Sequence, residues 1–126
     1  MNEMIYTGTR LNLPEVLYSE EYKGYKFYIL NLGTHPCAYV EIPKGNKFYE
    51  VEYDNIDIDC HCGLTYSNKS LRSVDESGWF IGWDYAHLGD YVSYFEYNYG
   101  EDKKWTTLEI YEECKNVIEQ LVELNK

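Results

Sequence analysis

The chain has 126 residues, and its 22 Asp and Glu residues against 11 Lys and Arg residues give a formal net charge of −11 at pH 7. So acidic a chain is a poor candidate for binding a nucleic-acid backbone, which needs a basic stripe, or an anionic lipid surface. No apolar run approaches the ~18 residues of a membrane span, and the first ten residues lack the apolar stretch of a signal peptide, so we expect a cytoplasmic protein. At this length a single domain over residues 1–126 is the simplest expectation.

The first part of the chain predicts short extended elements. Residues 4–9 favour an extended segment, and residues 14–21 favour one brief helical turn. Residues 24–32 carry large apolar side chains at every second position, which is typical of a strand. Thr34-His35-Pro36 forms a turn and residues 37–42 return as a second strand, so a β-hairpin is predicted here.

The middle of the chain predicts two more strands separated by polar loops. A long loop over residues 43–57 leads to a strand over 59–66, in which Gly63 marks a bulge or a close backbone approach. A polar, turn-rich segment over residues 67–77 follows. The next strand, over residues 78–83, is apolar on both faces and is therefore expected near the centre of the sheet.

The end of the chain predicts a helix. A fifth strand is expected over residues 92–97 and a loop over 98–102, before Thr106 and Glu109 provide the spacing of a capping box. Apolar side chains then recur at helical spacing over residues 107–124, opposite a row of glutamates. The predicted fold class is therefore α+β: an antiparallel sheet of five to six strands, with its core at about residues 3–97, and a C-terminal amphipathic helix packed on it.

Aromatic side chains are unusually frequent. Fifteen Tyr, four Phe and three Trp make 17% of the chain, more than one small core needs. They suit a subunit interface, the packing of a sheet, or walls that stack on a flat ligand. Tyr66, Trp79, Phe80 and Trp83 flank the gap at Gly63 and are the candidates for stacking surfaces, with the accommodation of a bulky neighbour as the structural alternative.

The cysteines are expected to be reduced, as in a cytosol. Cys60, His61 and Cys62, together with His87, offer ligands for zinc. On a strand, however, His61 would face away from both neighbouring thiols. We therefore expect buried free thiols rather than a bound metal, and no cofactor.

The run from Gly78 to Asp90 carries the strongest functional signal. An apolar strand is followed at once by Asp84, His87 and Asp90 at three-residue spacing. Polar side chains at the tip of a strand are typical of a site presented by a scaffold. Two carboxylates and an imidazole suit a divalent metal or a histidine base held by an aspartate. The alternative, which we favour over metal binding, is that the aspartates cap turns above a packed histidine.

Two further features bear on the chemistry. The sequence contains no nucleophile elbow, P-loop or dinucleotide fingerprint, so we expect a binding protein rather than an enzyme. Arg10, after Thr9 and the exposed N–H groups near Gly8, and Arg72, in a polar loop, are candidates for binding phosphate. Their alternative role is to neutralise nearby carboxylates.

Three motifs follow one another along the chain: His61-x-Gly63-Leu64-Thr65-Tyr66, the run Gly78-Trp79-Phe80-Ile81-Gly82-Trp83-Asp84-x-Ala86-His87-x-Gly89-Asp90, and Leu108-Glu109 at the start of the last helix. In this order they resemble the first type of Thoeris anti-defence protein, a family of small phage and prophage proteins. The resemblance covers most of the chain after about residue 30. It implies a sponge in the bacterial host cell that sequesters a glycocyclic ADP-ribose-type signal, and in some members cyclic oligonucleotides, without cleaving it. It also implies a homodimer or higher symmetric oligomer with ligand sites between subunits. The net charge of −11 argues against a membrane or a nucleic-acid polymer as a partner.

On this interpretation the candidate site combines stacking, phosphate-binding and hydrogen-bonding side chains. The candidate residues are Thr9, Arg10, Tyr66, Arg72, Trp79, Phe80, Trp83, Asp84, His87, Asp90 and Asn98. Two other functions remain open. One is an acidic phage inhibitor that imitates nucleic acid on a host defence protein, and the other is a metal-dependent nucleotide hydrolase that uses Asp84, His87 and Asp90.

Overall fold

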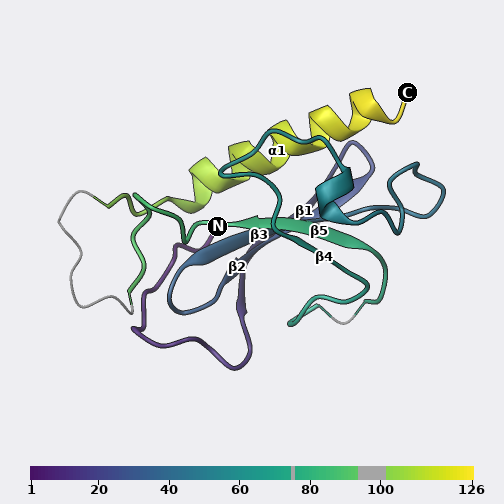
Figure 1. The fold of residues 1–126 in the computed structure, drawn as a ribbon. Coiled ribbons are helices and arrows are strands. Elements are labelled where there is room, and N and C mark those ends of the chain that lie inside the picture. The colour runs from purple at the N-terminus through teal and green to yellow at the C-terminus, as the bar shows by residue number, and fades with distance from the viewer. Residues whose placement is uncertain (75, 94–101) are drawn as a thin grey trace.

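In the described part of the chain, five strands form one antiparallel sheet, and one long helix lies across one face of it (Figure 1). The computed structural model describes residues 1–74, 76–93 and 102–126. The strand order is β1-β2-β3-β5-β4, and every neighbouring pair is antiparallel. The elements are β1 (Glu15–Tyr22), β2 (Tyr25–Asn31), β3 (Pro36–Glu41), the 3-10 helix η1 (Tyr53–Asn55), β4 (Tyr66–Asn68), β5 (Phe80–Asp84) and α1 (Thr107–Leu124). The predicted α+β fold class is confirmed.

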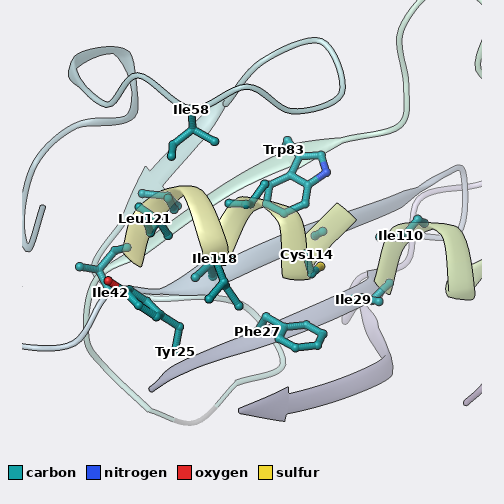
Figure 2. Close-up of a cluster of buried hydrophobic side chains, with 14 of the residues drawn as sticks. Tyr25, Phe27, Ile29, Ile42, Ile58, Trp83, Ile110, Cys114, Ile118 and Leu121 are labelled. Atoms are coloured by element: carbon teal, nitrogen blue, oxygen red, sulfur yellow. The ribbon is translucent and has the colours of Figure 1, made fainter. Parts of the chain in front are cut away.

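Helix α1 begins and ends where the sequence predicts. The Thr106 hydroxyl accepts a hydrogen bond from the Glu109 backbone N–H, and the Glu109 carboxylate accepts one from the Thr106 N–H, which completes the capping box. The apolar stripe is fully buried against the sheet (Figure 2). Its members are Ile110, Cys114, Val117, Ile118 and Leu121.

Alternation along the strands gives the sheet two different faces. On β5, Ile81 and Trp83 belong to the core under α1, whereas Phe80 belongs to a second, smaller core on the opposite face. Tyr39 of β3 lies on that opposite face too. We call it the open face, because α1 does not cover it. The central position predicted for the strand over residues 78–83 is confirmed, since β5 lies between β3 and β4.

The helical turn predicted over residues 14–21 is wrong, because this segment is strand β1. Its residues pair with β2 from Glu15 to Tyr22, with one irregularity between Val16 and Tyr18. Pro14, the first residue of the segment, favours a helix start locally, but the pairing of the following residues with β2 outweighs that preference.

The strand predicted over residues 59–66 is also wrong for most of its length. Cys62 and Gly63 both have left-handed backbone conformations, with φ of 57° and 82°, so the chain turns there instead of extending. The hydrogen-bonded strand begins only at Tyr66. Of the strand expected over residues 92–97, Val92 and Ser93 are in no strand, and the remainder lies outside the described residues.

In the described part of the chain, no helix combines the length and the apolar character needed to cross a bilayer.

Candidate functional site

A cavity of about 210 Å³ opens on the open face of the sheet. It lies where β3 begins and β5 ends, because Cys37 pairs with Asp84 there. Its lining residues are Arg10, Leu32, His35, Cys37, Tyr39, Thr65, Tyr66, Trp83 and Asp84. We call this cavity the sheet-end pocket. It brings together a guanidinium, a carboxylate, an imidazole, a hydroxyl and two phenol rings.

The N-terminal segment reaches the pocket by docking on Gly33. The Thr7 N–H donates to the Gly33 carbonyl at 2.8 Å, and the Leu11 N–H donates to the Leu32 carbonyl at 2.8 Å. Gly33 has φ of 90°, and a Cβ atom there would lie 2.3 Å from the Thr9 carbonyl oxygen. Only glycine fits this backbone conformation and this approach. The turn between β2 and β3 therefore holds Arg10 at the pocket.

Two tyrosine rings form the aromatic wall of the pocket. Tyr39 and Tyr66 meet edge to face, with ring centroids 5.1 Å apart. The Tyr39 ring also lies against Gly82, where a Cβ atom would be 2.4 Å from its Cδ1 atom. The Tyr66 hydroxyl donates to the Ser70 carbonyl at 2.7 Å, which fixes that ring from its outer end. The wall is therefore held in place by neighbours on both sides.

The polar wall consists of Asp84, Thr65 and His35. The Thr65 hydroxyl donates to Asp84 Oδ2 at 3.1 Å, and the Ala86 N–H donates to Asp84 Oδ1 at 3.1 Å. The His35 ring is buried, with its Nδ1 atom 2.9 Å from the Thr34 hydroxyl. Burial lowers the pKa of His35, with Asp84 opposing the shift and Arg10 adding to it. At neutral pH the pocket therefore contains a neutral imidazole together with a cation and an anion.

The buried imidazole predicts a pH-dependent loss of stability. His35 in the unfolded chain takes up a proton near its ordinary pKa of 6.5, whereas the folded protein resists protonation. The free energy of unfolding should therefore be unaffected by this group above pH 6.5 and should fall as the pH drops below it. Urea unfolding at about pH 7.5 and about pH 5.5 measures the effect. His35→Gln should show a smaller decrease between the two pH values, and an unchanged decrease would contradict the prediction.

Asp90 is the centre of a second polar group beside the pocket. Its side chain is 3% exposed and accepts three kinds of hydrogen bond. His61 Nε2 lies 2.8 and 3.0 Å from the two oxygens, the His87 backbone N–H donates at 3.0 Å, and the Trp105 indole N–H donates at 2.8 Å. The His61 ring also stacks on Tyr85, with centroids 4.7 Å apart. We call His61, His87, Asp90 and Trp105 the Asp90 cluster.

The structure therefore shows the turn-capping bonds that the sequence offered as an alternative for the two aspartates. Asp84 caps its turn through Ala86, and Asp90 caps its turn through His87. The three side chains also lie together, since His87 Nδ1 is 3.4 Å from Asp84 Oδ1 and 3.9 Å from Asp90 Oδ2. Asp84 lines the pocket and also contacts the cluster.

The thiols do not form an activated nucleophile. Cys37 and Cys114 are buried, and burial raises the pKa of Cys37 to about 12. Cys62 is exposed, but desolvation and then the Asp90 and Asp84 carboxylates raise its pKa too. A reactive cysteine needs the opposite environment, with nearby positive charge.

Most of the remaining candidate residues lie away from the pocket or are buried in the cores. Trp79 and Phe80 are buried in the two cores, so neither has an exposed ring for stacking on a ligand. Trp83 touches the pocket, but only 1% of it is exposed, and its indole N–H donates to the Tyr85 hydroxyl. Thr9 and Arg72 are exposed and do not line the pocket. Asn98 lies outside the described residues.

Sequence reasoning missed several residues of the site. His35 and Tyr39 were assigned only to a turn and a strand, and His61 and Trp105 were not placed near Asp90. One signal was present, because Cys37, Tyr39 and Glu41 alternate with the apolar side chains of β3, which marks a second face.

Comparison with protein-family models, with curated proteins and with solved structures finds no significant match to this chain.

Proposed function

We propose that this protein binds a cyclic ADP-ribose-type nucleotide and holds it without cleaving it. The observation that carries the proposal is the composition of the sheet-end pocket. Arg10, Asp84 and the Tyr39–Tyr66 pair come from four separate parts of the chain and line one cavity. A nucleotide offers the three matching groups, which are a phosphate, a ribose and a flat base.

Each wall suits one part of such a ligand. The Arg10 guanidinium can donate two parallel hydrogen bonds to a phosphate. The Asp84 carboxylate can accept from ribose hydroxyls, with the Thr65 hydroxyl beside it. Tyrosine rings present an apolar face or edge to a base. The neutral His35 can donate or accept, so it can match a base edge.

The size of the pocket favours a ligand shared between subunits. A cavity of about 210 Å³ is smaller than the ~300–1,000 Å³ of typical ligand pockets. It would enclose one end of a cyclic dinucleotide-like ligand and leave the other end exposed. We therefore include in the proposal a symmetric homo-oligomer, in which a second copy of this chain covers the exposed part of the ligand.

A capture-and-release experiment tests the proposal. Purified protein is mixed with the cyclic ADP-ribose product of a TIR-domain enzyme, the free nucleotide is filtered and quantified, and the protein is then heat-denatured. We expect the nucleotide to disappear from the filtrate and to return intact on denaturation. A nucleotide that returns altered would favour the hydrolase, and one that stays free would contradict binding.

Arg10→Ala should weaken capture by about 10–100-fold, because a charge-assisted hydrogen bond contributes roughly 1.5–3 kcal/mol. Isothermal titration calorimetry with the same nucleotide measures the change. Arg72→Ala is the matched control, since it removes the same charge from an exposed position that does not line the pocket. If the two variants lose affinity equally, the effect of Arg10 is one of overall charge and the assignment of the pocket is wrong.

A further inference from the structure

Two imidazoles and a thiol converge next to the Asp90 carboxylate. His61, Cys62 and His87 each place one ligand atom within 4.8 Å of the others. The sequence placed His61 and Cys62 on opposite faces of a strand, which would have kept them apart. The left-handed conformations of Cys62 and Gly63 turn the chain instead, so that neighbouring side chains reach the same region.

An independent observation points to a missing partner at this position. The Nδ1 atom of His87 is buried, and within the described residues it has no hydrogen-bond partner. The nearest carboxylate oxygens, on Asp84 and Asp90, are 3.4 and 3.9 Å away. A buried polar atom without a partner costs free energy and is uncommon in folded proteins. In the tautomer that carries its proton on Nε2, the Nδ1 lone pair is therefore free to accept a proton or to bind a cation.

We propose that His61, Cys62 and His87 bind a divalent transition-metal ion of the zinc class. Imidazole and thiolate are the ligands that zinc prefers, and three protein ligands leave one position open. Metal-bound histidines usually donate their other ring N–H to a carboxylate, and Asp90 gives His61 such a partner. The inference does not depend on the nucleotide proposal.

The surroundings support a cation here. The His61 backbone N–H donates to the Glu113 carboxylate at 2.9 Å, which ties the turn to α1, and Asp84 adds a second nearby carboxylate. Bond lengths of ~2.0–2.1 Å to nitrogen and ~2.3 Å to sulfur place the nitrogen and sulfur ligands of tetrahedral zinc roughly 3.3–3.6 Å apart. The three ligand atoms, which lie within 4.8 Å of one another, must therefore approach by up to about 1.5 Å, through rotation of the exposed Cys62 side chain and of the histidine rings.

Cobalt(II) is the probe that tests this site, because its spectrum identifies its ligands. The full chain, reduced with a phosphine and freed of metal, is titrated with Co²⁺ and then with Zn²⁺. We expect one Co²⁺ per chain, with the visible bands of a tetrahedral ion and a near-ultraviolet thiolate-to-metal band. Stoichiometric Zn²⁺ should displace it and remove both. No binding, or binding without the thiolate band, would overturn the proposal, since the latter indicates only acidic surface groups.

Variants locate the site. Cys62→Ser should abolish the thiolate band and weaken Zn²⁺ binding by more than about 100-fold, whereas Asp90→Asn, which changes a partner and not a ligand, should weaken it by about 10–100-fold. Cys60→Ser is the matched control, because this thiol is two residues away and outside the group of three. It should bind Co²⁺ as the unmodified chain does. Circular dichroism checks that each variant is folded, and His87→Gln provides a second ligand test if Cys62→Ser is not. If Cys60→Ser loses the band and Cys62→Ser keeps it, the assignment is overturned.

Discussion

Replacing Asp90 with alanine should lower the free energy of unfolding by about 3–5 kcal/mol, because each buried donor left without an acceptor costs roughly 1–3 kcal/mol. The variant leaves His61 Nε2, the His87 N–H and the Trp105 indole N–H without their common acceptor. These groups belong to the turn before β4, the turn after β5 and the segment before α1. The loss should therefore affect all three segments together. Urea unfolding in the presence of a metal chelator measures it.

Two further variants give this prediction its controls. Asp90→Asn keeps the shape but turns an amide N–H₂ toward one of the donors, so it should recover only part of the stability. Asp57→Ala removes an exposed carboxylate and should change the free energy of unfolding by less than about 0.5 kcal/mol. If Asp90→Ala were as mild as Asp57→Ala, the three donors must find water or other partners, and the cluster would not be a structural centre.

The parts of the fold that could be predicted are those whose signal is local. The capping box of Thr106 and Glu109 and the helical spacing after it define α1 without any other part of the chain. The hairpin of β2 and β3 is likewise defined locally, by alternation and turn residues, and β5 by a continuous apolar run. Such signals survive in the fold because local preference and tertiary packing agree there.

The predictions that were wrong concern elements that depend on the fold around them. Strand β1 forms because it pairs with β2 along its whole length, and the sequence of residues 14–21 does not by itself indicate that pairing. The turn at Cys62 depends on two left-handed residues, one of them a cysteine, which sequence rules do not assign to that conformation. Pairing and strain of this kind are decided by the folded chain as a whole.

In the candidate site, too, the local features could be predicted and the contacts between distant residues could not. The spacing of Asp84, His87 and Asp90 predicts that they can meet, because all three lie at or just after the end of β5. The approach of Arg10 depends on the glycine at position 33, and the approach of His61 depends on the turn at Cys62. The buried positions of Trp79 and Phe80 depend on which face of β5 meets α1 and which meets the open-face core. The chemical groups of a site can therefore be predicted from the sequence more readily than the residues that contact them in the fold.

Gly82→Ala should lower the free energy of unfolding by about 2–3 kcal/mol and weaken nucleotide capture at the same time. The new Cβ atom would lie 2.4 Å from the Tyr39 Cδ1 atom and 2.7 Å from the Ala38 carbonyl oxygen. The ring can move away, but the carbonyl belongs to the ladder between β3 and β5 and cannot move without separating the strands. Since Tyr39 is a wall of the sheet-end pocket, its displacement should change the pocket even in molecules that remain folded.

Gly78→Ala is the matched control, because it lies just before β5 and its Cβ atom would be no closer than 3.5 Å to the Glu41 side chain. It should change stability by at most about 0.5–1 kcal/mol, and in the stabilising direction if the conformation suits alanine. A double-mutant cycle with Tyr39→Ala separates the two clashes at Gly82. Removing the ring should cancel the part of the penalty that arises from Tyr39 and leave the part that arises from Ala38. Strict additivity would mean that the ring and Gly82 do not constrain each other, and the aromatic wall would then owe its position to Tyr66 alone.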